Sequence, residues 1–170
     1  MSQPLTERIS DELLRMEEDC THSAKSHFNA QARWNRWNYL FGLPSVVISA
    51  LAGTAFFKDY AAVAGVMTAV VTVLTALMTF LKPSERANAH KNSGDQYLSL
   101  RNDARVYRLI GLTMATEEEA AIAGMTGLTT RRNELNQASP PVSGRDFRKA
   151  KAGIDAGEAV HAVDRREAQA

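Results

Sequence analysis

Two long apolar segments stand next to each other in the first half of the chain. The first covers residues 39–57 and the second residues 61–81, and neither contains a charged side chain. Each has about 20 residues, which as a helix rising ~1.5 Å per residue gives about 30 Å, the thickness of a bilayer's hydrocarbon core. We therefore predict a hairpin of two transmembrane helices, joined by a very short turn that contains Lys58 and Asp59.

The alternative is a buried hairpin inside a soluble helical protein. The chain has 170 residues, and 23% of them are charged. The polar remainder is too short to enclose two uniformly apolar helices, so the membrane interpretation is favoured. The formal net charge of +1 gives no reason to expect direct nucleic-acid binding. The single cysteine, Cys20, excludes an internal disulfide framework and fits a reducing compartment.

Aromatic and basic residues stand where the hairpin would meet lipid headgroups. Tryptophan and tyrosine favour this depth because one end of the ring is apolar and the other is polar. The predicted interface anchors are Trp34, Trp37, Tyr39, Arg33, Arg36 and Lys82. Basic residues flank both outer ends of the hairpin, whereas the turn has only Lys58 beside Asp59. The excess of positive charge predicts that both termini are cytoplasmic.

The residues before the hairpin predict an amphipathic helix that continues into the first span. Thr6 is a candidate N-cap. Apolar residues then recur at helical spacing, at Ile9, Leu13, Met16, Cys20 and Ala24.

The residues after Pro83 predict further helices. One face of the first contains Ala89, Ser93, Tyr97, Leu100, Ala104 and Tyr107. Other apolar residues lie elsewhere on this helix, namely Leu98, Val106, Leu109 and Ile110, which predicts packing against several neighbours.

Two more helices complete the chain. Thr116 and Glu119 form a candidate capping box for a helix that ends near Leu135. Prolines 140 and 141 break the pattern, and Ser143 with Asp146 can begin a last helix. Its predicted stripe contains Phe147, Ala150, Ile154 and His161.

The predicted fold class is an all-α membrane protein with a two-helix transmembrane hairpin and N- and C-terminal cytosolic helices that form a helical bundle. Residues 1–38 form the N-terminal cytosolic helix and residues 39–81 the hairpin. Residues 82–166 form the C-terminal cytosolic helices, and residues 167–170 a frayed tail. No strand pattern is present.

The chain shows no catalytic pattern. Its four histidines are scattered, and Cys20, His22 and His27 match no familiar zinc spacing. A phosphate-binding glycine loop and a nucleophile motif are also missing from the sequence. We therefore expect no enzymatic activity, no catalytic residue, no metal and no cofactor.

Small and hydroxyl-bearing residues form faces on both spans. The candidate pore or helix-contact face contains Thr68, Thr72, Thr75, Thr79, Gly65, Ala69, Ser45, Ser49 and Gly53. Small residues allow helices to approach closely in lipid. They either pack the two spans together or join neighbouring copies. In a ring of copies the hydroxyls could line a narrow polar path. The bulky residues of the second span would face lipid, including Val63, Val66, Met67, Val70, Leu74, Leu77 and Phe80.

The chain resembles the SLATT domain family, a two-transmembrane effector module associated with SMODS nucleotidyltransferases and SLOG sensor domains. The resemblance covers residues 8–165. It rests on the approach ARWNRWNYLFGLPSVVISALAG, the short hairpin, the helix AHKNSGDQYLSLRNDARVYR and the terminal PPVSGRDFRKAKAGIDAGEAVHAVD.

The resemblance implies a pore-forming or membrane-perturbing effector of bacterial anti-phage defence, acting in abortive infection. It implies a homo-oligomer, located as a multi-pass protein in the bacterial inner membrane. Its trigger would be a separate partner that senses infection or produces a nucleotide or nucleic-acid signal, such as a nucleotidyltransferase, a SLOG protein or a reverse transcriptase.

Two other functions remain open from the sequence. The hairpin could be a passive membrane anchor and assembly scaffold whose cytosolic helices recruit a partner. It could also belong to a small channel or transporter accessory subunit. These alternatives differ in whether the protein itself changes membrane permeability.

Overall fold

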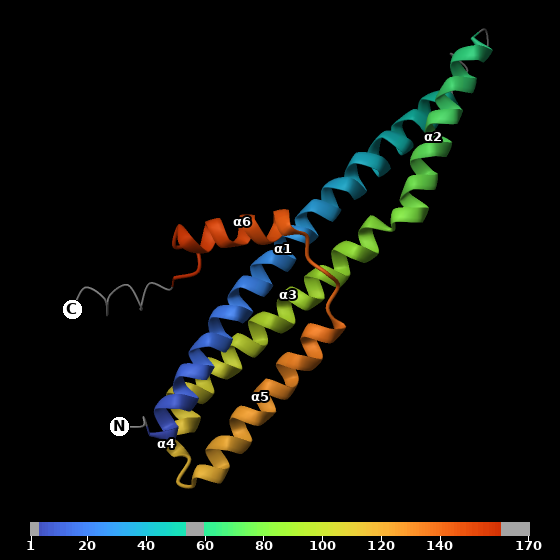
Figure 1. Ribbon diagram of the computed structural model, residues 1–170. Helices are drawn as coiled ribbons and strands as arrows, with labels where there is room; N and C mark the ends of the chain where they lie inside the picture. Colours follow the sequence, from blue (N-terminus) through green and yellow to red (C-terminus); the bar gives the residue numbers. More distant parts are fainter. Residues whose placement is uncertain (1–3, 54–59, 161–170) are drawn as a thin grey trace. The chain divides into compact units, whose positions relative to one another are not determined.

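The computed structural model describes residues 4–53 and 60–160. These ranges contain helices and their connections and no strand, so the predicted all-α class is confirmed for them. The helices are α1 (Leu5–Ala52), α2 (Ala61–Leu81), α3 (Pro83–Val106), α4 (Leu112–Met114), α5 (Glu118–Ala138) and α6 (Gly144–Asp155) (Figure 1). A π-helical segment, Tyr107–Gly111, connects α3 to α4. The predicted turn at Lys58 and Asp59, the position of His161 and the predicted tail 167–170 lie outside the described residues.

The chain divides into two compact units. Residues up to Ala30 and from Ala89 onward form the first unit, here called the bundle. Residues Gln31–Asn88 form the second, here called the hairpin. Helix α1 contributes to both because it continues without interruption from Leu5 to Ala52, as the sequence pattern predicts. The predicted boundaries at residues 39 and 81 refer to a bilayer and stay predictions.

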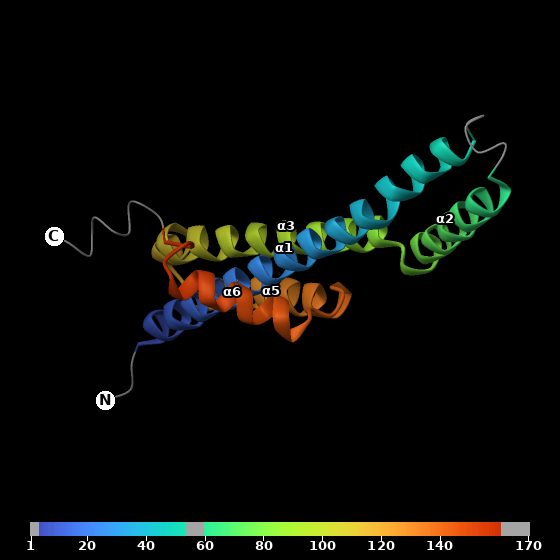
Figure 2. The same ribbon diagram turned by 90° about the horizontal axis from the view of Figure 1, so that it is seen from above.

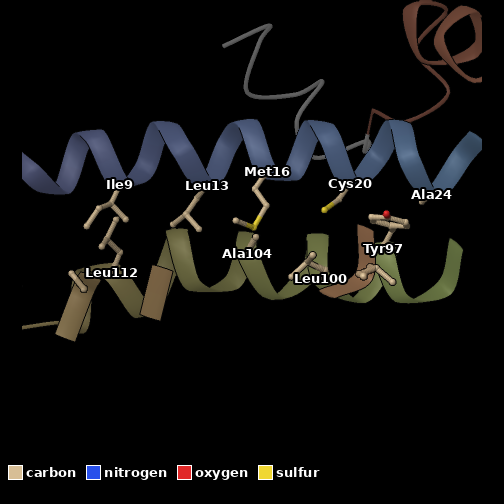
Figure 3. Close-up of a cluster of buried hydrophobic side chains, with 11 residues drawn as sticks. Ile9, Leu13, Met16, Cys20, Ala24, Tyr97, Leu100, Ala104 and Leu112 are labelled. Atoms are coloured by element: carbon tan, nitrogen blue, oxygen red, sulfur yellow. The ribbon is translucent and has the colours of Figure 1, made fainter. Parts of the chain in front are cut away.

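The core of the bundle lies between the first half of α1 and α3. The predicted α1 stripe is buried at every position, and its side chains point toward α3 (Figure 3). Ile9 lies opposite Leu112, while Cys20 lies near Leu100 and Tyr97, so the two helices run in opposite directions. Figure 2, seen from above, also shows α1 beside α3. The stripe positions are Ile9, Leu13, Met16, Cys20 and Ala24, and each is at most 3% exposed.

The predicted α3 face is confirmed at its centre and corrected at its ends. Ser93, Tyr97, Leu100 and Ala104 are buried. Ala89 is exposed, and the neighbouring His90 is buried in its place. A helix turns about 100° per residue, so the buried face at this end is displaced by one position.

The predicted packing on several sides of α3 is only partly confirmed. Leu98 packs against the bundle core. Val106, Leu109 and Ile110 are each more than half exposed, so the prediction of neighbours around them is wrong within the described residues. These three residues lie at or beside the π-helical segment, which changes the direction in which successive side chains point.

Tyr107 connects the π-helical segment to α5. It is only partly buried, and its hydroxyl donates to the carbonyl oxygen of Ala121 at 3.0 Å. The ring lies so close to Gly111 and Gly124 that a Cβ atom at either glycine would overlap it. Glycine at these two positions therefore provides the space that the tyrosine ring occupies.

Three helix caps were predicted, of which two are wrong and one is confirmed. Helix α1 begins at Leu5, so Thr6 lies inside its first turn and is not the N-cap. The N-cap of α5 is Glu117, without a side-chain capping bond, so the predicted capping box at Thr116 is wrong. The Ser143 cap of α6 is confirmed, because its hydroxyl accepts from the Asp146 N–H at 3.2 Å.

The buried face of α6 also differs from the predicted stripe. Ala150 is buried as predicted, but Phe147 is 49% exposed and the preceding Asp146 is buried. The backbone carbonyl of Asp146 accepts from the Asn29 side chain at 3.2 Å, which joins α6 to α1. Figure 1 shows α6 crossing α1 at a marked angle.

Ion pairs connect the first half of α1 to the later helices of the bundle. The Arg108 guanidinium donates to Glu17 at 2.7 Å, and both side chains are less than 20% exposed. Arg132 on α5 pairs with Asp19 at 2.7 Å. The Glu17 pair is the better shielded of the two from water, so its loss would leave a poorly solvated charge.

Candidate functional site

Covered side chains form one row on each helix of the hairpin, and these two rows face each other. Phe41 is buried and the other members are partly covered. The second half of α1 runs beside α2 in both Figures 1 and 2. On α1 the row contains Trp34, Asn38, Phe41, Ser45, Ile48 and Ala52. On α2 it contains Ala64, Met67, Val71, Leu74, Met78 and Leu81. Both rows repeat at alternating three- and four-residue steps, the spacing of helices that pack along their length.

The row on α2 includes two residues that were predicted to face lipid. Met67 and Leu74 are partly covered, whereas the other bulky residues predicted to face lipid are exposed. Gly42 on α1 lies close to Met78 on α2. A Cβ atom at Gly42 would lie 3.6 Å from the Met78 sulfur. A long, flexible methionine thus packs between these helices at Gly42. Packing of the two spans by their small residues was one of the two alternatives that the sequence left open.

One helical stretch in the described residues is long and apolar enough to cross a membrane. It begins at Ala61, and its most apolar window has a mean hydropathy of 2.2 with no residue buried. The large exposed side chains on α2 are Val63, Val66, Val70, Val73, Leu77 and Phe80. Of the first apolar segment, the described part ends at Gly53, so its predicted length as a span is not covered.

Helix α2 ends sharply at the predicted boundary. Lys82 adopts a left-handed conformation with φ of 45°, and its N–H donates to the Met78 carbonyl at 3.0 Å. Helix α3 then starts at Pro83. Proline disfavours a helical conformation in the residue before it, which explains the break at Lys82. In contrast, α1 continues through Pro44.

The threonine stripe of α2 is exposed along its whole length. Thr68, Thr72, Thr75 and Thr79 all lie outside the partly covered row. Three of the hydroxyls donate to the carbonyl four residues earlier, at 2.9 Å for Thr68 and Thr72 and 3.0 Å for Thr79. Each such hydroxyl keeps oxygen lone pairs that face outward and can accept a hydrogen bond.

Of the five small residues in the candidate face, one is partly covered and four are exposed. Ser45 is partly covered, and its hydroxyl donates to the Phe41 carbonyl at 2.6 Å. Gly65, Ala69, Ser49 and Gly53 are exposed. A Cβ atom at Gly65 would meet no heavy atom within 4 Å. These four positions therefore do not pack α1 against α2.

Three of the predicted interface anchors are exposed on α1. Tyr39 is 62% exposed, and Arg36 is exposed beside Trp37. Trp37 is 41% exposed and stacks on Phe41 with ring centres 5.3 Å apart. Lys82 is exposed and pairs with Glu85 at 3.1 Å.

The remaining anchors, Arg33 and Trp34, lie together with Arg86, one of the basic residues predicted to flank the second span. The guanidinium carbon of Arg33 is 5.1 Å from the centre of the Trp34 ring, and that of Arg86 is 4.8 Å from it. Arg86 follows the end of α2 by only five residues, so its place near the span was predictable from the sequence, but its contact with Trp34 was not. Its contact with Trp34 depends on the way α3 returns beside α1.

Sequence reasoning also missed a pair of buried histidines in the bundle. The Nδ1 atoms of His27 and His90 are 3.0 Å apart, and both residues are less than 5% exposed. Burial and the adjacent His90 lower the pKa of His27 to about 4. Burial raises the pKa of the Cys20 thiol to about 11, so this cysteine stays protonated and unreactive at neutral pH.

Within residues 4–53 and 60–160, no three histidine, cysteine or acidic side chains gather in a way that could hold a metal ion. Comparison with known proteins gives no match to any family model, curated protein or solved structure.

Proposed function

We propose that this protein inserts its hairpin into a membrane and assembles into an oligomer that makes the membrane permeable. The observation that carries the proposal is the surface of α2, a 21-residue helix without a buried residue or a charged side chain. In water such a surface would be unfavourable by roughly 25 cal/mol for each Å² of apolar area. A bilayer removes that cost, and a helix satisfies its own backbone hydrogen bonds there.

Assembly is supported by the faces that the hairpin leaves uncovered. The exposed small residues Gly65 and Ala69 stand beside the threonine stripe on α2. In lipid there is little hydrophobic drive between helices, so close backbone approach and hydroxyl contacts stabilise association. A second copy can meet this face, and the outward oxygens of Thr72 and its neighbours then line a polar path between copies.

The biological role that fits this behaviour is that of a triggered membrane effector. We propose that a separate partner senses infection or produces a nucleotide or nucleic-acid signal, and that the assembled protein then depolarises a bacterial inner membrane. The resemblance to SLATT domains motivates this role. We place the surface for the trigger on the bundle, where exposed ion pairs such as Arg132–Asp19 lie outside the apolar core.

The experiment is induced expression in bacteria, with a membrane-potential dye and carbonate extraction of the membrane fraction. We expect the protein in the extracted membrane pellet and loss of potential after induction with its trigger, or at high expression without it. Gly65→Leu should prevent depolarisation because its side chain blocks close approach, whereas the adjacent Val66→Leu should leave it intact. Thr72→Val with Thr75→Val keeps the shape but removes two hydroxyls, and it should reduce conductance without preventing insertion.

The outcomes separate this proposal from a passive anchor. A protein that stays in the membrane pellet but never depolarises cells would be an anchor or scaffold. Equal activity of the Gly65→Leu and Val66→Leu variants would contradict the proposed contact face. A protein released by carbonate would contradict the membrane hairpin itself.

A further inference from the structure

Two positively charged side chains meet at one indole ring in the hairpin. Arg33 comes from α1 and Arg86 from α3, and both guanidinium groups lie about 5 Å from the centre of the Trp34 ring, at 5.1 and 4.8 Å. The electron-rich face of an indole attracts a guanidinium, which holds each cation in place. The indole thus gathers two positive charges at one place in the hairpin, and both attract an anion that approaches Trp34.

The charge of Arg86 is not neutralised by the described part of the chain. No described carboxylate pairs with Arg86, and the adjacent Glu85 pairs with Lys82 instead. Arg86 is exposed, and its side chain is therefore accessible to a ligand.

A groove lies one helical turn from this cluster, toward the apolar part of the hairpin. It has a volume of about 280 Å³ and is lined by Asn38, Met78, Thr79, Lys82, Pro83, Ser84 and Glu85. Asn38 follows Trp34 by four residues on α1, and Lys82 precedes Arg86 by four. Met78 and Thr79 belong to the last turn of α2, so the groove extends from the polar end of the hairpin onto the helix proposed to span the membrane.

We propose that Arg33, Trp34 and Arg86 bind the phosphate of an anionic phospholipid, whose glycerol and upper acyl chain lie in the groove beside Met78. Guanidinium groups suit this ligand because their planar N–H groups can donate in pairs to phosphate oxygens. The indole supplies an apolar surface at the depth of the glycerol backbone. The site rests on the proposed membrane position of the hairpin, but not on its proposed permeability or assembly.

The test uses the full-length protein in uncharged detergent micelles. Trp37→Phe leaves Trp34 as the only tryptophan, so its fluorescence reports on the site. Phosphatidylglycerol and phosphatidylcholine, each with brominated acyl chains that quench tryptophan, are titrated separately. We expect half-maximal quenching at about a tenfold lower concentration of phosphatidylglycerol, because its headgroup carries a net negative charge that the two guanidiniums contact.

The matched variants are Arg86→Gln and Arg8→Gln. Arg86→Gln should weaken phosphatidylglycerol binding about tenfold through the loss of one charged contact. Arg8 is exposed near the start of α1 in the bundle, so Arg8→Gln removes an equal charge away from the hairpin and should change binding less than about twofold. Arg86→Lys retains the charge and serves as a second variant if circular dichroism shows that Arg86→Gln does not fold, and it should bind with intermediate strength.

Inorganic phosphate provides the last comparison, because it presents the same anion without acyl chains. We expect no displacement of phosphatidylglycerol at millimolar phosphate. Displacement at that concentration would show a site for free anions and overturn the lipid assignment. Equal quenching by the two lipids, or equal effects of Arg8→Gln and Arg86→Gln, would also overturn it. Carbonate extraction of the same variants reports membrane insertion separately, so failure of this site and failure of the membrane hairpin are distinguishable.

Discussion

His27 on α1 and His90 on α3 meet inside the bundle, with 3.0 Å between their Nδ1 atoms. His27 also stacks on Tyr97, with ring centres 5.5 Å apart. Two neutral imidazoles can share one hydrogen bond in this geometry, because one Nδ1 donates and the other accepts. Protonation of the accepting Nδ1 would direct two N–H groups at each other and bury a positive charge.

This geometry predicts that the bundle loses stability in mild acid. The pKa of His27 falls from 6.5 to about 4 on folding, so between these values the unfolded chain binds a proton that the folded chain does not. The free energy of unfolding should therefore be constant above pH 6.5 and decrease by about 3 kcal/mol as the pH falls to 4. Urea unfolding followed by circular dichroism at pH 7.5, 6, 5 and 4 measures this change.

Matched histidine variants assign that pH dependence to the buried pair. His27→Phe removes the titrating group and should flatten the curve between pH 6.5 and 4. His22→Phe, on the same helix, should keep the wild-type slope. An unchanged slope in His27→Phe would show that other groups cause the acid sensitivity.

Leu100 and Leu109 provide a direct test of the bundle core. Leu100 is 0% exposed and lies in the core cluster, whereas Leu109 is 57% exposed. Leu100→Ala should lower the free energy of unfolding by about 2–5 kcal/mol, because it removes buried methyl groups and leaves a cavity. Leu109→Ala should change it by less than about 0.5 kcal/mol. Urea denaturation midpoints that coincide for the two variants would contradict the core described here.

Gly124 and Gly127 lie in the same helix but should respond oppositely to alanine. A Cβ atom at Gly124 would overlap the Tyr107 ring, whereas nothing lies within 4 Å of one at Gly127. Gly124→Ala should destabilise the protein by roughly 1–3 kcal/mol, as expected for overpacking. Gly127→Ala should stabilise it by about 0.5–1 kcal/mol, the usual difference between these residues in a helix. Thermal unfolding of both variants measures the two signs, and stabilisation by Gly124→Ala would show that Tyr107 does not occupy this space.

The membrane orientation can be tested with single cysteines in a Cys20→Ser background. Tyr60 and Thr116 are both exposed, at the start of α2 and before α5. If the basic residues hold both termini in the cytoplasm, Tyr60→Cys should react with a membrane-impermeant thiol reagent in intact cells. Thr116→Cys should react only after the cells are lysed. Labelling of Thr116→Cys in intact cells would reverse the orientation.

The periodicity of apolar residues predicted most of the helices correctly. The stripe from Ile9 to Ala24 requires only that one helix face be apolar, which local spacing determines. The Ser143 cap was predictable for a similar reason, since its partner Asp146 is three residues away. The two rejected caps, at Thr6 and Thr116, have side chains that suit a cap, but the helices begin at other residues.

The sequence predicted which residues form the candidate faces, but not how the helices arrange those faces in space. The sequence placed the threonines and small residues on faces of α2. It did not determine which face meets α1, because small and bulky faces can each pack in lipid. The covered row with Met67, Leu74 and Met78 depends on how the two helices lie against each other.

By itself, the sequence determined the helical class, the length and apolar character of α2, and the absence of charge from it. These properties follow from neighbours within a few residues along the chain. Only the tertiary structure decided that His27 meets His90, that Arg86 joins Arg33 at Trp34, and that Tyr107 requires glycine at position 124. These pairs are separated by up to 63 positions in sequence. Their contacts depend on helix rotation and register, which the packing of whole helices determines and no local pattern encodes.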